Sequence, residues 1–151
     1  MAIREKTSVI IKVKGEGASH SRIDVSVRDL VTTIDEPAAR GGTNLGPAPT
    51  ETAVAALAGC TNTIGNKCAK ALDIDAGLIN VEIECDFDRR GVLLKEEIDV
   101  PFTAIRQSVT CSGSASAAEL ERLGEEVAKF CPLSKLFEGA GAKVETTWSK
   151  A

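Results

Sequence analysis

The sequence predicts an α+β fold with the element order β-β-β-α-β-β-α-α-β, in a single domain over residues 1–151. Several segments alternate apolar and polar residues, which is the period of a half-buried strand. A long Ala-rich segment and a later amphipathic segment follow helical spacing instead. The length of 151 residues is that of one ordinary domain.

The first third of the chain is expected to form three antiparallel strands. Apolar residues alternate with polar ones over 7–14 and 22–27, and 30–34 is a third short run. The segment 15–21 between them is expected to be a turn. Residues 35–49 are rich in Gly, Pro and Asn, and a loop of this length in a compact domain points to a function.

The segment 50–72 is the strongest predicted helix. Glu51 suits the positive end of its dipole, and the stretch up to Cys60 is apolar nearly all round. Such a helix must be covered on every side, and a chain of this length has few elements for that. The pattern therefore favours an obligate dimer.

The remaining elements complete the predicted order. Residues 77–88 and 98–112 alternate as strands, and 143–148 form a final strand. Residues 114–130 form an amphipathic helix that Ser116 and Glu119 start as a capping box. A shorter helix opens at Cys131-Pro132 and runs through Phe137, because proline favours the first helical turn.

Composition excludes several classes of function. The net charge of −4 and the aromatic content of 3% are unlike a nucleic-acid-binding protein. Residues 1–15 carry several charges and no apolar run long enough for a signal peptide or a membrane span, so we expect a cytoplasmic protein.

The cysteines do not form a structural framework. Their number is odd and their spacing irregular, which argues against structural disulfides. With one histidine and no CxxC pair, no metal site is expected. The five are Cys60, Cys68, Cys85, Cys111 and Cys131.

Two of the cysteines have unusual contexts. Cys131 is expected at a helix N-terminus, which stabilises thiolate, although a capping residue without chemistry fits equally well. Cys60 lies within the apolar helix, where a small core residue is the commoner interpretation. Cys68 is two turns from Cys60 and cannot bond it directly, and Cys85 and Cys111 are expected to fill the sheets.

Charged side chains are weaker candidates. Arg22, Arg28 and Arg40 lie at strand ends or in the Gly-rich loop, where most arginines are simply solvated. The favourable interaction of Glu51 with the helix dipole at the start of its helix is sufficient to explain a glutamate at this position.

Two separated motifs resemble the OsmC/Ohr family of thiol-dependent hydroperoxide reductases and their relatives. The first is Pro47-Ala48-Pro49-Thr50-Glu51 followed by AVAALAGCTNTI, and the second is Phe130-Cys131-Pro132-Leu133-Ser134. An IDEP-x(4)-GG segment precedes them, and the predicted order of elements also agrees over nearly the whole chain.

The resemblance implies an intertwined homodimer with antiparallel sheets wrapped around long central helices and with active sites at the dimer interface. By motif position, Cys60 would be the peroxidatic nucleophile and Cys131 the resolving cysteine, assisted by Arg22 and Glu51. Glu51 stands nine residues before Cys60, where the hydroperoxide reductases have ten, and nine steps of about 100° place it on the opposite side of a regular helix.

The resemblance also implies a reaction. Organic hydroperoxides would be reduced to alcohols through a Cys60 sulfenate and a Cys60–Cys131 disulfide, and a small or protein-bound dithiol of the dihydrolipoyl type would restore the thiols. No metal, flavin or nucleotide cofactor is expected. A buried Cys60 would need a cation, Arg22 or Arg40, to become acidic. The alternatives are a non-enzymatic binding protein for a small apolar ligand, and a redox sensor that oxidises stoichiometrically.

Overall fold

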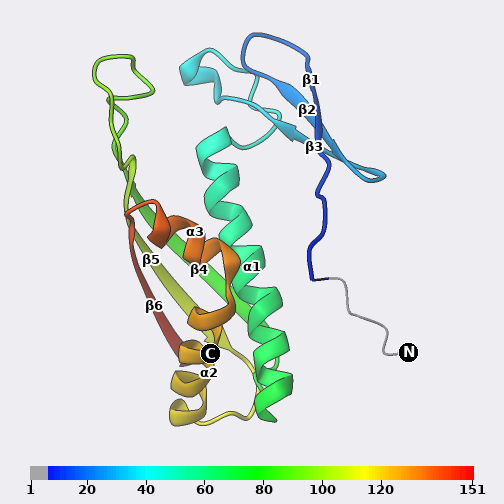
Figure 1. Cartoon of the computed structure of the whole chain (residues 1–151), viewed down its shortest axis with the longest axis vertical. Coiled ribbons are helices and arrows are strands. Elements are labelled where there is room, and N and C mark those ends of the chain that lie inside the picture. The colour runs from blue at the N-terminus through cyan, green and yellow to red at the C-terminus, as the bar shows by residue number, and fades with distance from the viewer. Residues whose placement is uncertain (1–6) are drawn as a thin grey trace. The chain divides into compact units, whose positions relative to one another are not determined.

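The computed structural model describes residues 7–151 (Figure 1). Its backbone divides into two compact units, one ending at Thr52 and the other running from Ala53 to Ala151. Residues 1–6 lie outside the described residues, and with them part of the charged segment 1–15 in which neither a signal peptide nor a membrane span is expected. Among those described, no helix combines the length and apolar character that crossing a bilayer requires.

The first unit contains an antiparallel sheet in the order β1-β2-β3, as the sequence predicts. Ile23 of the central strand lies opposite Gly17 on one side and Ile34 on the other. The strands are β1 (Lys14–Gly17), β2 (Ile23–Val27) and β3 (Leu30–Ile34).

The prediction of a strand over 7–14 was wrong in its position. β1 begins only at Lys14 and continues to Gly17, into the predicted turn. The partner strand explains the shift, because Lys14 already lies opposite Ser26, one residue before β2 ends. The alternating residues Val9, Ile11 and Val13 precede that register, and their side chains are exposed.

A buried carboxylate organises the Gly-rich loop that follows β3. Asp35 is fully buried, and it accepts hydrogen bonds from the backbone N–H groups of Glu36 (2.8 Å), Thr43 (3.0 Å) and Leu45 (3.2 Å). The hydroxyls of Ser21 and Thr43 also donate to it. Asp35 therefore satisfies donors that a loop with few backbone pairs leaves open.

The second unit is a three-stranded sheet with helices packed on one face (Figure 1). The strand order is β4-β5-β6, with an antiparallel β4/β5 pair and a parallel β5/β6 pair. The first helix, α1, begins in the first unit and continues through the second. The elements are α1 (Pro49–Leu72), β4 (Ile79–Phe87), β5 (Phe102–Cys111), α2 (Ala117–Phe130), α3 (Pro132–Gly139) and β6 (Lys143–Lys150).

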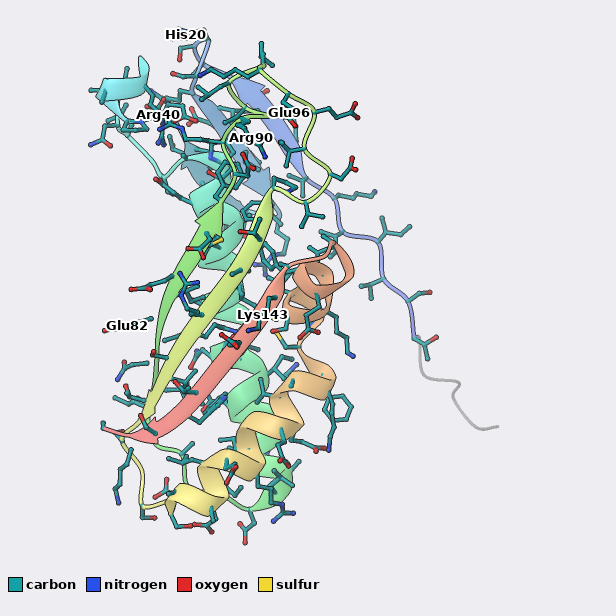
Figure 2. All side chains as sticks on the ribbon, turned by 90° about the vertical axis from the view of Figure 1, so that its left-hand side faces the viewer. His20, Arg40, Glu82, Arg90, Glu96 and Lys143 are labelled. Carbon is teal, nitrogen blue, oxygen red and sulfur yellow. The ribbon has the colours of Figure 1, made fainter. Side chains whose placement is uncertain are left out.

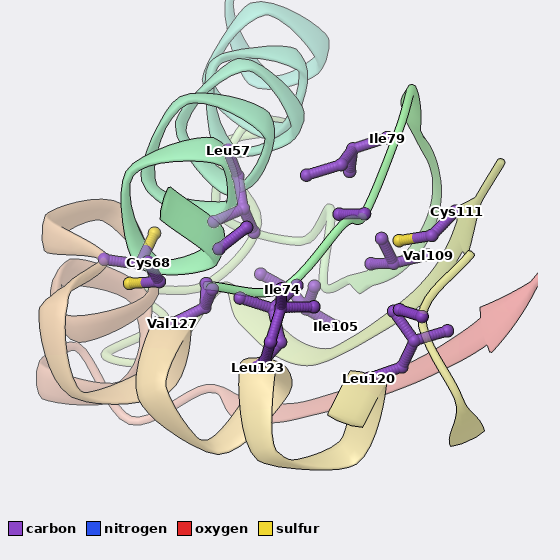
Figure 3. Close-up of a cluster of buried hydrophobic side chains, with 14 of the residues drawn as sticks. Leu57, Cys68, Ile74, Ile79, Ile105, Val109, Cys111, Leu120, Leu123 and Val127 are labelled. Carbon is purple, nitrogen blue, oxygen red and sulfur yellow. The ribbon is translucent and has the colours of Figure 1, made fainter. Parts of the chain in front are cut away.

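The core of this unit lies between the sheet and the helices (Figure 3). Leu57 from α1, Ile105 and Val109 from β5, and Leu120 and Leu123 from α2 have no exposed surface. The central strand β5 alternates buried and less buried residues, as its sequence pattern predicts.

The helix starts also follow the sequence. Ser116 caps α2, its hydroxyl accepting from the N–H of Glu119, while the Glu119 carboxylate accepts from the N–H of Ser116 at 2.7 Å. This is the predicted capping box. Cys131 ends α2 and is the N-cap of α3, with Pro132 as the first residue of that helix, which confirms the predicted break.

Charged side chains lie on the outer edges of the second unit. In the link between β4 and β5, Arg90 contacts both Asp88 and Glu96 at 2.7 Å (Figure 2). Figure 2 also shows Glu82 on β4 and Lys143 on β6, both of them exposed.

One side of α1 remains uncovered. Ala55, Ala56 and Gly59 are exposed, although Leu57 between them is fully buried. Within one chain, only part of the apolar surface of α1 is therefore buried.

Candidate functional site: a pair of facing thiols

The structure brings Cys60 and Cys131 together. Their Sγ atoms lie 3.3 Å apart, although 71 residues separate them in sequence. Cys60 lies in the middle of α1, and Cys131 stands at the junction of α2 and α3. Both are free thiols, and a small movement of either side chain would bring the sulfurs to bonding distance, about 2.05 Å.

The two sulfurs differ in access and in partners. Cys131 has no exposed surface, whereas Cys60 is half-buried. As N-cap, the Cys131 sulfur accepts from the backbone N–H of Ser134 at 3.5 Å. Ser134 is itself buried and lies in the first turn of α3.

These surroundings shift the pKa values of the two thiols in opposite directions. Burial raises the pKa of the Cys60 thiol, and the neighbouring Cys131 adds to the rise against the opposing effect of the Leu133 N–H. Burial also disfavours the charged thiolate form of Cys131. However, the hydroxyl and N–H of Ser134, together with the Cys60 thiol, outweigh it and hold the pKa of Cys131 below its ordinary value.

Arg22 belongs to the first unit and is engaged with a carboxylate. It stands directly before β2, where its Nε and Nη2 atoms donate to Asp24 at 3.3 and 2.9 Å. This pairing lowers the pKa of Asp24 and raises that of Arg22. The role of Arg22 at Cys60 stays a prediction.

Glu51 also has partners in the first unit. Its Oε2 atom accepts from the N–H of Ala48 at 2.8 Å, and its Oε1 atom lies 3.7 Å from Nη2 of Arg40. Arg40 ends the short 3-10 helix η1 (Ala38–Arg40) and bonds Glu36 as well. Glu51 and Arg40 thus form one charged cluster, and their roles in the chemistry of Cys60 stay predictions.

The other three cysteines occupy ordinary positions. Cys68 is buried on α1, and Cys85 and Cys111 lie on β4 and β5. Burial raises the pKa of each of these thiols, which disfavours the reactive thiolate.

A cavity of about 590 Å³ reaches the segments that carry the cysteine pair. Its wall includes Thr61, next to Cys60, and Ser134, three residues after Cys131, together with Gln107, Val127 and Trp148. Neither sulfur lines it. Within residues 7–151, no three His, Cys, Asp or Glu side chains gather in a way that would hold a metal ion.

Sequence reasoning missed the part that Ser134 plays. The motif places this serine three residues after an N-cap cysteine, and the N3 amide of a helix is the usual donor to an N-cap side chain. That spacing could have identified the contact. The buried partners Thr61 and Gln107, joined by a 2.9 Å hydrogen bond, had no local signal because they are 46 residues apart.

Comparisons with solved structures agree with this architecture. An OsmC-like protein from Mycoplasma pneumoniae has a TM-score of 0.81 at 16% identity, over 96% of this chain and 99% of the other. An organic hydroperoxide resistance protein OsmC from Legionella pneumophila scores 0.67 at 17% identity over 97% and 99%. The organic hydroperoxide resistance protein OhrB of Bacillus subtilis scores 0.62 at 21% identity over 95% and 98%.

The comparison with family models identifies the family of the chain. No curated protein sequence matches the chain significantly. The family model described as OsmC-like protein matches residues 42–147, a range that includes both Cys60 and Cys131. The chain therefore belongs to the OsmC-like protein family.

Proposed function

We propose that this protein is a cysteine-based peroxidase that reduces organic hydroperoxides to alcohols. The observation that carries the proposal is the 3.3 Å contact between the Sγ atoms of Cys60 and Cys131. Two facing free thiols, one of them at a helix N-terminus, are the arrangement that a two-cysteine peroxide cycle needs.

Exposure supports the division of roles. Cys60 is the half-buried member of the pair, so a hydroperoxide meets its sulfur first. Cys131 has no exposed surface and serves as the resolving thiol behind it.

The cycle has three steps. Cys60 attacks the terminal oxygen of ROOH, the O–O bond breaks, and the products are ROH and Cys60 sulfenic acid. The Cys131 thiolate then attacks the Cys60 sulfur, which forms the disulfide and releases the sulfenic oxygen as hydroxide, and the hydroxide takes a proton from solvent to become water. An external dithiol reduces this disulfide by exchange and leaves as its own disulfide.

The reductant and substrate belong to the same proposal. A small or protein-bound dithiol of the dihydrolipoyl type would carry the two electrons. Organic hydroperoxides are favoured over hydrogen peroxide because Cys60 packs against the apolar core. The resistance proteins of Legionella pneumophila and Bacillus subtilis, which share the fold, support this substrate class.

A homodimer is also proposed. The exposed face of α1 at Ala55, Ala56 and Gly59 is made of small residues that allow another helix to approach closely. Covering this face would complete the burial of a helix whose sequence is apolar nearly all round.

Turnover with cumene hydroperoxide and dihydrolipoamide tests the function, with hydrogen peroxide and thioredoxin as the comparison substrate and reductant. We expect faster turnover with the organic hydroperoxide. Peptide mapping after one equivalent of oxidant should find Cys60 joined to Cys131, and Cys131→Ser should let Cys60 proceed to sulfinic acid.

Three results would overturn the proposal. A main disulfide from Cys60 to Cys68 or Cys111 would contradict the two-cysteine cycle. Oxidation of one equivalent without turnover under any dithiol would indicate a redox sensor, and no oxidation at all would indicate a binding protein.

A further inference from the structure

The cavity near the thiol pair has walls that the proposed peroxide cycle does not use. It lies wholly within the second unit, where α2 and α3 pack beside β6 (Figure 2). Its volume of about 590 Å³ is in the usual range of small-molecule sites, about 300–1,000 Å³. Neither Cys60 nor Cys131 lines it. The cavity is therefore a candidate binding site separate from the sulfurs.

Three carboxylates line this cavity from two helices. Glu121 and Glu125 lie one turn apart on α2, and Glu138 lies on α3. Within residues 7–151, none of the three takes part in an ion pair, and no lysine, arginine or histidine lines the wall. Like charges four residues apart on a helix repel each other. A cation held between these side chains would relieve that repulsion.

Ser134 is a second, independent indication of a ligand. It lines the same cavity, although the residue is only 7% exposed. Its backbone N–H donates to the Cys131 sulfur, but its hydroxyl oxygen accepts no hydrogen bond from any group within residues 7–151. Buried polar groups of folded proteins normally have their hydrogen-bond partners. An acceptor left open at a cavity wall is suited to a donor on a bound molecule.

An indole and two aliphatic side chains form the apolar part of the wall. Trp148 lines the cavity together with Val127 and Val144. The negative face of an indole attracts cations, and tryptophan is the strongest of the aromatic side chains in this interaction. The valines favour an aliphatic group over a hydrated inorganic ion, because apolar surface is then removed from water.

We propose that this cavity binds a small organic cation that carries a primary ammonium group on an aliphatic chain. An ammonium group has three donors, so it can bond the Ser134 oxygen and a carboxylate at the same time. A quaternary ammonium has no N–H and could not use the serine. The proposal goes beyond the peroxidase function and does not depend on it, since no step of the thiol cycle passes through the cavity.

The proposed dimer contact leaves this cavity free. Gly59 is exposed on the face of α1 where the second copy is proposed to pack, whereas Thr61 is buried and lines the cavity. Two residues correspond to about 200° around a helix, so Gly59 and Thr61 lie on nearly opposite sides of α1. A second helix packed against Gly59 would therefore not fill the cavity.

Tryptophan fluorescence and calorimetry test the proposal on the full, reduced protein. Trp148 is the only tryptophan of the chain, so an ammonium group beside it should change its emission. The probe is n-pentylamine near neutral pH, and we expect saturable binding of one molecule per chain. Pentan-1-ol and tetramethylammonium are the comparison compounds. Both should bind at least about tenfold more weakly, because each lacks the charge or the N–H donors.

Two outcomes of this comparison would overturn the proposal. Absence of saturable n-pentylamine binding would show that the cavity is not a cation site. Equal binding of tetramethylammonium would show that N–H donors, and with them the Ser134 oxygen, play no part in recognition.

Variants of the wall locate the bound amine. Ser134→Ala removes the open acceptor and should weaken n-pentylamine binding about tenfold, because a hydrogen bond to a charged group is lost. Glu121→Gln combined with Glu125→Gln should weaken it about fivefold, as expected for partly exposed charge pairs. Circular dichroism checks the fold of each variant. If Ser134→Ala does not fold, the exposed glutamates of α2 decide the test.

Matched controls remove the same groups outside the cavity. Glu82→Gln changes an exposed carboxylate of β4 (Figure 2), and Ser26→Ala changes a half-buried serine of β2. Both should bind n-pentylamine within about twofold of wild type, because distant surface charges are screened by salt. An equal loss in Glu82→Gln would indicate general attraction to the negative chain and would overturn the site. Unchanged binding in folded Ser134→Ala or in the α2 double variant would overturn it as well.

Discussion

The hydroxyl of Thr61 donates a 2.9 Å hydrogen bond to Oε1 of Gln107, and both side chains are buried. The amide nitrogen of Gln107 donates in turn to Thr146 on β6 at 3.1 Å. Because Thr61 directly follows Cys60, this polar chain fixes the rotation of α1 at Cys60.

Thr61→Val should therefore lower stability. The substitution keeps the shape of the side chain but leaves Oε1 of Gln107 buried without its donor, which costs about 1–3 kcal/mol. Urea unfolding followed by circular dichroism measures the change in the free energy of unfolding. Thr63→Val, at an exposed position of the same helix, is the control and should change it by less than about 0.5 kcal/mol.

Gly124→Ala should destabilise the chain although alanine is the better helix former. A Cβ at Gly124 would lie 2.5 Å from Cδ1 of Trp148, so the indole or α2 must move. We expect a loss of about 1–3 kcal/mol, the usual cost of overpacking, with a changed fluorescence of this single tryptophan. Gly139→Ala on α3 has no atom within 4 Å of the added carbon and should cause no such loss.

Gly59→Glu should dissociate the proposed homodimer. The glutamate side chain would lie on the exposed face of α1 formed by Ala55, Ala56 and Gly59, where the partner helix is proposed to pack. Burying an unpaired charge in that contact costs several kcal/mol. Analytical ultracentrifugation should show a dimer for wild type and for Ala118→Glu, which is exposed on α2, and a monomer for Gly59→Glu. A folded wild-type monomer at low concentration would contradict the homodimer.

Arg22→Ala should slow the alkylation of Cys60 near neutral pH. In its predicted role Arg22 stabilises the Cys60 thiolate, so its removal should raise the pKa of Cys60. Each unit of pKa changes the thiolate population about tenfold, and we expect a decrease of that order. Arg106→Ala removes an arginine similarly bonded to a carboxylate, Asp86 on β4, and serves as the control. An unchanged rate in Arg22→Ala would transfer the prediction to Arg40 or Arg28.

Asp35→Asn should lower the melting temperature at neutral pH and lose this effect in acid. Hydrogen bonds from Thr43, Glu36, Leu45 and Ser21 hold the pKa of Asp35 far below its ordinary value despite its burial. Since the folded state has the lower pKa, the stabilisation is present above the unfolded value near 3.8 and is lost as pH falls through the folded value.

Thermal unfolding from pH 7 down to pH 3 measures this linkage. The difference between wild type and Asp35→Asn should narrow below about pH 4, because the unfolded chain then binds a proton at Asp35 that the folded protein, with its lower pKa, does not yet bind. Asp29→Asn, at an exposed turn between β2 and β3, should follow the wild-type profile. A constant difference over the whole range would show that Asp35 does not act through its charge.

The sequence by itself determined the elements whose signals are local. Period-two alternation identified β2, β4 and β5, and the Ser116–Glu119 capping box marked the start of α2. The proline after Cys131 located the break between α2 and α3. These features depend on residues a few positions apart, so backbone preference and side-chain periodicity are sufficient to specify them. The motifs around Cys60 and Cys131 likewise pointed to the family.

Only the tertiary structure decided which distant groups meet. Alternation in residues 7–14 could not show that β1 starts at Lys14, because its limits depend on where β2 ends. The contact of the Cys60 and Cys131 sulfurs depends on the packing of α1 beside the α2–α3 junction. The same holds for the Thr61–Gln107 bond between α1 and β5. Such distances are set by the volumes and registers of whole elements, which no local sequence pattern encodes.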